Sequence, residues 1–379
     1  MVNKISRHIK PQLEKWFYQG KALLLIGPRQ VGKTTLLKQL AAEKNEDAIW
    51  LDADLPEIRQ QLENPTLATI KATIGNYQLV IIDEIQRLPN AGLLLKIMVD
   101  NFKEVQFIAT GSSSLEISET IFEPLTGRHI LFNLYPFSIS ELYPNKSPFE
   151  IEQTLGFHLV YGMYPEITQK QDVAETLLQN LAEQYLYKDV LIWKDIRKPE
   201  LLDKLLKLLA YQVGAEVNNH ELANALKVQS ETVESYIDLL EKSFVVYRLK
   251  SYSTNERKEV SKMSKVYFWD NGIRNAVIGN YNPLPNRNDH GQLWENFITS
   301  ERLKHLRWTN SKAKSYFWRN YNQSEVDYVE LENDQLTAYE MKWNTTKNHK
   351  VTRAFTNMYP NAKTNIITPK NFMGFVLSV

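Results

Sequence analysis

Short apolar runs alternate with helical spacing in the first third of the chain. The runs are Ala22–Ile26, Ile49–Asp52, Leu79–Asp83 and Val105–Thr110, and helical stretches lie between them. Apolar runs of this length are typical of strands buried on both faces, and their alternation with helices is typical of parallel sheets. The first part of the chain is therefore predicted to be a parallel α/β sheet covered by helices, with a further strand at His129–Leu134.

The pattern changes twice in the remaining chain. Residues 147–198 and 200–250 have helical spacing, and a β-rich segment follows at Lys265–Trp269. The turn-rich segment Asn280–His290 resembles a linker. Beyond it we expect a helix at Leu293–His305 and then three strands, at Tyr316–Arg319, Val326–Leu331 and Leu336–Trp343. This order indicates four domains, at residues 1–146, 147–198, 199–279 and 290–379.

Composition narrows the class of protein. The 379 residues include 45 Lys or Arg and 44 Asp or Glu, so no global charge favours DNA or a membrane surface. The chain has no cysteine, which excludes disulfides and thiolate metal sites and fits a cytoplasmic protein. No apolar run approaches the roughly 18 residues of a membrane span, and the N-terminus lacks the apolar core of a signal peptide. We expect no membrane contact, and any nucleic-acid contact must use a local patch.

A phosphate-binding loop follows the first predicted strand. Gly27–Thr34 (GPRQVGKT) fits G-x-x-x-x-G-K-[ST] and lies between a strand and a helix. Glycines let backbone N–H groups point at phosphate oxygens, while Lys33 reaches the β- and γ-phosphates and the Thr34 hydroxyl holds Mg²⁺. The flanking strand and helix disfavour the alternative of a glycine turn with a stray lysine. The predicted ATP-binding residues are Gly27, Pro28, Arg29, Gln30, Val31, Gly32, Lys33, Thr34 and Thr35.

Candidate hydrolytic residues follow later strands of the same sheet. The run LVIIDE ends in Asp83, predicted to order Mg²⁺, and Glu84, predicted to polarise the attacking water. Ser112 or Ser113, at the end of another strand, is a candidate contact for the γ-phosphate or the water, although a helix cap is an equal alternative. Arg128 is a candidate arginine finger, acting in its own chain or across the interface of a homo-oligomer. Its alternative is a salt-bridged surface arginine.

The middle of the chain contains a helix-turn-helix pattern with an acidic second helix. His220–Leu226 and Ser230–Lys242 form the two helices, and two short β segments follow as a candidate wing. The second helix carries four acids, which repel phosphates, so a packing or partner-binding role is favoured over groove reading. The four acids are Glu231, Glu234, Asp238 and Glu241. The basic stretch Asn255–Lys265, which includes Arg257, Lys258 and Lys262, is either a phosphate contact or a solvated loop.

Acidic residues and a lysine recur with metal-site spacing near the C-terminus. Glu340 and Lys342 are two residues apart on a predicted strand and share one face, Asp327 lies on the preceding strand, and Glu295 lies on the helix before it. Carboxylates around a lysine suit one or two Mg²⁺ ions that activate water on a phosphodiester. The metal ligands predicted there are Glu295, Asp327 and Glu340, with Glu340 and Lys342 as catalytic residues. The alternative is an ordinary exposed strand face.

Charge and aromatic residues in this last segment fit a polyanion without requiring one. Residues 295–379 hold twelve Lys or Arg and eight Asp or Glu, a net charge of +4. Tyr316, Trp318 and Tyr321 interleave with this charge. They are candidates for stacking on bases, although such residues more often belong to a core.

Several of these motifs together resemble one protein family. Taken in order, they resemble the prokaryotic AAA+-type ATPases that carry a C-terminal domain of unknown function. The motifs are Gly27–Thr35 (GPRQVGKTT), Leu79–Gln86 (LVIIDEIQ), Gly111–Ser114 (GSSS), Leu125–Arg128 (LTGR), Tyr135–Leu142 (YPFSISEL) and Tyr161–Glu166 (YGMYPE). The resemblance implies an AAA+-like P-loop parallel sheet, a helical lid, a winged-helix middle and a C-terminal α/β domain with a restriction-endonuclease-like fold. Asp327 followed by Glu340-Met341-Lys342 resembles the D…E-x-K constellation of such nucleases.

Two functions are consistent with these residues. The first is an ATP- and Mg²⁺-dependent enzyme that binds or processes nucleic acid, with DNA the expected substrate, through its nuclease-like tail. The second is a nucleotide-dependent switch that binds a protein partner and carries an inactive tail. The intact set of Glu295, Asp327, Glu340 and Lys342 favours the first. The acidic helix and the near-zero net charge favour the second.

Overall fold

The computed structural model describes residues 5–64, 66–112, 123–184, 199–253, 264–344 and 349–377. The chain divides into two compact units, and each is described by itself. The first unit comprises Met1–Tyr135 with Lys242–Phe244, and the second comprises Pro136–Glu241 with Val245–Val379. No helix in the described ranges has the length and apolar character needed to cross a membrane.

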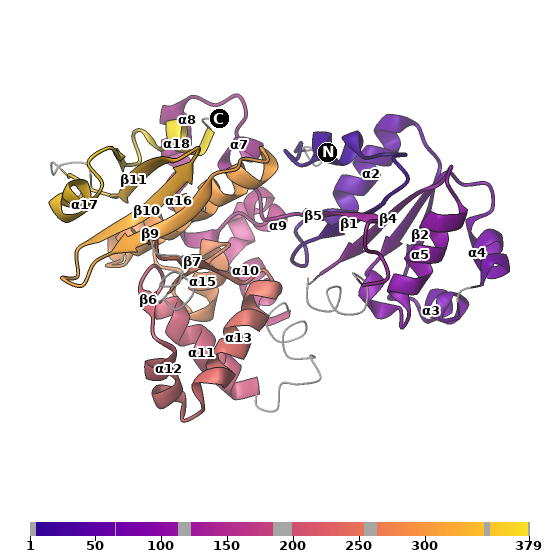
Figure 1. The fold of residues 1–379 in the computed structure, drawn as a ribbon, viewed down its shortest axis with the longest axis horizontal. Coiled ribbons are helices and arrows are strands. Elements are labelled where there is room, and N and C mark those ends of the chain that lie inside the picture. The colour runs from indigo at the N-terminus through magenta and orange to yellow at the C-terminus, as the bar shows by residue number, and fades with distance from the viewer. Residues whose placement is uncertain are drawn as a thin grey trace. The chain divides into compact units, whose positions relative to one another are not determined.

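The first unit is built on a five-stranded, all-parallel sheet (Figure 1). Its strands lie in the order β2-β3-β4-β1-β5, so β4 lies between β1 and β3. All five residues of β1 are buried, which explains its uninterrupted apolar sequence. The predicted parallel α/β sheet is therefore confirmed. The strands are β1 (Ala22–Ile26), β2 (Ala48–Asp52), β3 (Leu79–Asp83), β4 (Gln106–Gly111) and β5 (His129–Asn133).

Helices connect these strands and bury the apolar faces of the sheet. Leu23 and Leu25 of β1 pack in one cluster with Leu36 and Leu40 of α2 and with Leu13 of α1. Full burial of each such leucine contributes about 1.5–3 kcal/mol, so this cluster fixes the start of α2 against the end of β1. The helices are α1 (Lys10–Lys15), α2 (Lys33–Lys44), α3 (Pro56–Leu62), α4 (Leu67–Ile74) and α5 (Ala91–Asn101).

The second unit begins with helices and a small antiparallel sheet. Its helix α8 starts at the Ser147 capping box and ends at Gly162, whose φ is +79°. A Cβ at Gly162 would lie 2.0 Å from an oxygen of Asp270, so only glycine permits this end. Strands β6, β8 and β7 pair in that order. The elements are α7 (Ile139–Leu142), α8 (Pro148–Tyr161), α9 (Pro165–Gln169), α10 (Ala174–Gln184), α11 (Pro199–Tyr211), β6 (Glu216–Val217), α12 (Asn219–Leu226), α13 (Ser230–Lys242), β7 (Val246–Lys250) and β8 (Ser264–Phe268).

A four-stranded sheet completes the second unit. Its order is β12-β11-β10-β9, with β9, β10 and β11 antiparallel and β12 parallel to β11. The sequence predicted the first three strands, whereas β12, α17 and α18 were not predicted. The elements are α15 (Asn271–Val277), α16 (His290–Trp308), β9 (Lys314–Arg319), β10 (Glu325–Glu332), β11 (Gln335–Met341), α17 (Arg353–Met358), β12 (Lys363–Ile367) and α18 (Phe372–Leu377).

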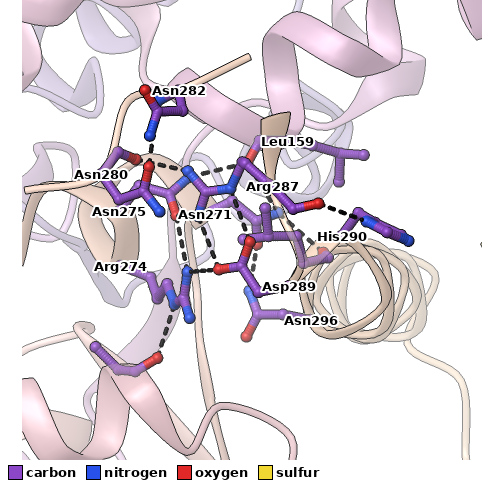
Figure 2. Close-up of polar contacts among 12 residues, drawn as sticks. Leu159, Asn271, Arg274, Asn275, Asn280, Asn282, Arg287, Asp289, His290 and Asn296 are labelled. Carbon is purple, nitrogen blue, oxygen red and sulfur yellow. Dashed lines mark hydrogen bonds and ion pairs between the residues drawn. The ribbon is translucent and has the colours of Figure 1, made fainter. Parts of the chain in front are cut away.

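A buried polar network holds the turn-rich segment 280–290 inside the second unit (Figure 2). Asp289 accepts hydrogen bonds from Arg274 (2.5 Å) and from two nitrogens of Arg287 (both 2.8 Å). Arg287 also donates to the backbone oxygen of Asn280 at 2.7 Å. Asn275 donates to two backbone oxygens at the end of α8, at 3.0 and 2.8 Å. Paired charges thus anchor segment 280–290 to Arg274 of α15, and the Asn275 amide of α15 joins the same network to α8.

Candidate functional site

The P-loop is shaped by contacts that only glycine allows. A Cβ at Gly27 would lie 2.1 Å from the backbone oxygen of Leu134, and Gly32 has φ +97°. The Lys33 ammonium is buried and donates to the backbone oxygens of Gly27 (2.8 Å) and Pro28 (3.1 Å). The loop is therefore curled around its own lysine at the C-terminal end of β1. This is where the phosphates of a nucleotide bind in such sheets.

Two hydroxyl groups converge on Asp83. Thr34 donates to one carboxylate oxygen at 2.9 Å, and Thr110 donates to the other. Hydroxyl and carboxylate oxygens are the ligands that Mg²⁺ prefers, so Thr34 and Asp83 fit the predicted metal site. Thr110 was not predicted. The sequence feature that could have identified it is its position at the end of β4, the strand between β1 and β3.

Glu84 is held in a strained conformation beside these groups. Its φ is +52°, an uncommon value for a residue with a side chain, and its N–H donates to the Thr110 hydroxyl at 3.2 Å. The Gln86 amide, in the 3-10 turn η1 (Ile85–Arg87), donates to Glu84 Oε2 at 2.5 Å and to Ser112 Oγ at 3.1 Å. Within the described ranges, no donor faces the buried Gln86 Oε1. The structure thus brings Glu84 and Ser112 together through Gln86, while Ser113 lies outside the described residues.

Arg128 lies at the wrong edge of the sheet for its own nucleotide site. Its backbone oxygen accepts from the N–H of Ala22, the first residue of β1. Because the strands are parallel, Arg128 is at the N-terminal edge, whereas the P-loop follows the C-terminal edge, about 15 Å away along the strand. Its Nε instead donates to Asp100 at 2.7 Å, and this bond lowers the pKa of Asp100. The prediction that Arg128 acts in its own chain is therefore wrong, and action on a neighbouring chain stays a prediction.

Three of the predicted C-terminal residues meet on one face of the four-stranded sheet. The Lys342 ammonium lies 2.9 Å from Asp327 Oδ2 and 2.7 Å from Glu340 Oε2. The register that pairs Tyr328 with Tyr339 continues to place Asp327 opposite Glu340. The pairing of β10 with β9 is irregular between Val326 and Val329, on either side of Asp327. Such irregularities re-aim a side chain and often occur next to active sites.

The electrostatics of this group are those of crowded carboxylates. Burial and the neighbouring charge of Asp327 raise the pKa of Glu340 to about 8. Burial alone would lower the pKa of Lys342, but Asp327 and Glu340 raise it. The ammonium of Lys342 thus compensates two carboxylates that would otherwise repel each other.

Glu295 belongs to an adjoining pair of charges. It accepts hydrogen bonds from Lys265 (3.1 Å) and Tyr267 (2.7 Å), and Lys265 also lies 2.6 Å from Glu325. Burial, and then the charge of Asp327, raise the pKa of Glu295, although Lys265 opposes them. Lys265 was a candidate phosphate contact; that prediction is wrong because its side chain is 1% exposed. Arg257, Lys258 and Lys262 lie outside the described residues.

Lysines occupy the spaces between these carboxylates. Over the described ranges, no group of three or more His, Asp or Glu side chains is arranged to hold a metal ion. Asp327 and Glu340 share Lys342, while Glu295 and Glu325 share Lys265. The three predicted ligands are therefore divided between two lysine-bridged pairs, and Glu325, which was not predicted, is the fourth carboxylate.

Other predicted surfaces have different roles in the structure. Arg248 of β7 binds Glu234, Asp238 and Glu241, so three acids of α13 are neutralised within the unit. Trp318 is buried and Tyr316 packs against the same core cluster, which leaves Tyr321 as the exposed aromatic of the three, with 93% exposure.

Comparisons with known proteins agree with the P-loop geometry. Residues 19–143 match a family described as AAA domain. Residues 152–283 match a domain of unknown function (DUF8612), and residues 290–373 match another (DUF4143). The chain therefore carries an N-terminal AAA-type, P-loop ATPase-like domain followed by two domains without an assigned function.

Similar proteins occur in distant microbes. The "Uncharacterized protein Rv2008c" of Mycobacterium tuberculosis is 28% identical over 331 residues, covering 86% of this chain and 71% of the relative. An "Uncharacterized protein" of Haemophilus influenzae is 22% identical over 302 residues, covering 77% and 72%. The "Uncharacterized protein MJ1637" of Methanocaldococcus jannaschii is 28% identical over 315 residues, covering 71% and 65%.

Proposed function

We propose that this protein is a Mg²⁺-dependent ATPase that couples nucleotide hydrolysis to binding or processing of nucleic acid, with DNA the expected substrate. The observation that carries the ATPase part is the convergence of Thr34, Thr110 and Asp83 beside the P-loop lysine. The match of residues 19–143 to an AAA domain supports it. The nucleic-acid part rests on the C-terminal group of Asp327, Glu340 and Lys342.

In the proposed reaction, side chains of the first unit position water and stabilise charge. The backbone of the P-loop and Lys33 neutralise the phosphate oxygens, on which negative charge develops during transfer. Glu84 accepts a hydrogen bond from the attacking water and orients it toward the γ-phosphate. Thr34 and Asp83 would hold Mg²⁺, which would supply further charge neutralisation at the phosphates.

Gln86 positions Glu84 in this proposal. Its amide nitrogen fixes one carboxylate oxygen of Glu84 and joins it to Ser112. Its Oε1, which has no donor among the described residues, belongs to the same amide, so it offers a second acceptor within a few ångströms of that carboxylate. Two acceptors for the two protons of one water would direct the water's lone pair at phosphorus. This arrangement gives Ser112 an indirect role, through Gln86.

The second unit supplies the proposed nucleic-acid module. The order α11, β6, α12, α13, β7 and β8 supports the proposed winged helix. In the sheet that follows, Lys342 contacts both Asp327 and Glu340, which supports the proposed resemblance to the D…E-x-K group of restriction-endonuclease-like folds. In a nuclease, these carboxylates with Glu295 would hold Mg²⁺, and Lys342 would stabilise charge on the phosphodiester.

One observation favours an alternative function for this unit. The carboxylates are bridged by Lys342 and Lys265, and Arg248 neutralises the acidic face of α13. These contacts suit a structural core that binds a protein partner under nucleotide control, without cleavage.

ATP turnover in the presence of different nucleic acids tests the proposal. Purified protein is assayed with ATP and Mg²⁺, alone and with single-stranded DNA, double-stranded DNA or RNA. We expect turnover that one of these polymers stimulates. Turnover that none of them changes, together with no binding of any of them, would replace the nucleic-acid function with the partner-binding switch.

A further inference from the structure

A cavity on the four-stranded sheet is lined by basic residues. It has a volume of about 320 Å³ and lies between the segment that leads into α17 and the edge strand β12. This volume is at the lower end of the range for ligand sites, about 300–1,000 Å³. The lining residues are His349, Lys350, Val351, Arg353, Thr356, Thr364, Asn365 and Ile366.

The charge of this cavity is positive and uncompensated in the described structure. Its described lining includes Lys350 and Arg353, both exposed, and contains no carboxylate. Among the described residues, neither Lys350 nor Arg353 has an acidic partner at ion-pair distance. Lys342 and Arg319, which lie on or beside the same sheet, are instead paired with acids. Within the described residues, Lys350 and Arg353 therefore carry charge that no carboxylate compensates.

The polar and apolar parts of the lining also suit a phosphodiester chain. Thr356 and Thr364 provide hydroxyl donors, and Arg353 can bind two phosphate oxygens at once. His349 is held by a hydrogen bond between its Nε2 and the backbone oxygen of Asn344 at 3.1 Å. Val351 and Ile366 form the apolar part of the wall, which fits a sugar ring better than water.

The cavity lies on the same face of the sheet as the C-terminal group of Asp327, Glu340 and Lys342. Strands β11 and β12 are parallel, and Glu340 pairs with Ile366 while Ala338 pairs with Thr364. Paired residues of neighbouring strands point to the same side, about 4.8 Å apart. The N–H of Lys342 also donates to the backbone oxygen of Ile367 at 2.9 Å. The cavity is therefore one strand away from Glu340 and Lys342.

We propose that this cavity, built around Lys350 and Arg353, binds the backbone phosphate of a nucleic-acid strand and guides that strand across the sheet to Asp327, Glu340 and Lys342. The inference rests on the proposed nucleic-acid function and deepens it by naming the surface that holds the polymer. A polymer is favoured over a free anion because the cavity and the C-terminal group of Asp327, Glu340 and Lys342 share one face of the sheet. A chain of phosphates can occupy both at once.

The test is nucleic-acid binding by the full-length Lys350→Gln/Arg353→Gln protein, measured over a series of salt concentrations. Fluorescently labelled single-stranded DNA, duplex DNA and RNA are the probes, and anisotropy gives the affinity. Each lost phosphate contact lowers the salt slope by about 0.9 for duplex or 0.7 for single strands. At 0.15 M salt two lost contacts correspond to an affinity loss of about 15- to 30-fold. The control is the Lys312→Gln/Lys314→Gln protein, which changes two exposed lysines at the start of β9 and has the same change in net charge. It should bind nucleic acid like wild type.

The outcomes separate this inference from the proposed function. If wild type binds and Lys350→Gln/Arg353→Gln binds with the same slope and affinity, the cavity is not the phosphate site, while the proposed function stands. An equal loss in the control variant also overturns the inference, because it would show a general charge effect. If wild type binds none of the three probes, both the inference and the nucleic-acid function are wrong. Unchanged melting and ATP turnover of the variants verify that their folds are intact.

Discussion

Asp289 is the residue whose loss should most damage the second unit. It is the shared counter-charge of Arg274 and Arg287, whose side chains are 3% and 0% exposed. Asp289→Ala removes three hydrogen bonds and leaves two buried guanidinium groups without a carboxylate (Figure 2). Breaking a buried pair by removing one partner costs about 3–5 kcal/mol, because the remaining charge is uncompensated. With a urea slope of about 2.5 kcal/mol/M, the unfolding midpoint should fall by about 1–2 M.

The pH dependence of this loss gives a second measure. Burial alone would raise the pKa of Asp289, but Arg287 and Arg274 lower it to about 2. Because the folded pKa lies below the unfolded value, the carboxylate stabilises the fold above about pH 4. This contribution, about 2 kcal/mol, is lost as the pH falls from about 4 to 2. The difference between wild type and Asp289→Ala should therefore shrink over the same interval.

Tryptophan fluorescence during urea unfolding is a suitable assay, since Trp269, Trp294 and Trp318 all lie in the second unit. The control is Asp203→Ala, which removes a partly exposed pair with Lys207 and should cost less than about 0.5 kcal/mol. An Asp289→Ala protein that unfolds within about 1 kcal/mol of wild type would refute the argument that this network anchors segment 280–290.

Three further predictions concern the two candidate sites. Gln86→Ala should lower kcat for ATP by about 10-fold or more with little change in KM, because the Glu84 carboxylate loses the hydrogen bond that orients it; an unchanged kcat would assign Gln86 a structural role only. If Arg128 completes a neighbour's site, mixing Arg128→Ala with Lys33→Ala should restore part of the turnover that each lacks, and no recovery at any protein concentration would exclude action in trans. Asp327→Ala should abolish cleavage of DNA or RNA while ATP hydrolysis persists; equal loss of both activities would contradict separate sites.

Short-range sequence patterns predicted the strands and the residues at their ends. Three features follow from apolar runs and from the two-residue period of a strand: the buried strand before Gly27, the acids Asp83 and Glu84 at the end of β3, and the shared face of Glu340 and Lys342. Each of these rests on residues that are close together in the chain. Local pattern is sufficient there because a P-loop needs its own strand and helix and little else.

Features that depend on strand order could not be predicted in the same way. The sequence left the role of Arg128 open, because its edge of the sheet is known only once β5 is seen to run parallel to β1. Thr110 reaches Asp83 only because β4 lies between β1 and β3. Lys265 binds Glu295 from thirty residues away in the chain, so its sequence context of basic residues gave the opposite expectation. In each case a long-range contact outweighs the local pattern.

ATP turnover by Glu84→Gln tests the central claim most directly. The substitution keeps the size of the side chain and removes the carboxylate that orients and polarises the attacking water, while Lys33, Thr34 and Asp83 remain in place. Nucleotide binding by Glu84→Gln should equal that of wild type, and its hydrolysis should fall by about 100-fold or more. Wild-type turnover in this variant would contradict the account, because the water would then be activated by a group other than Glu84.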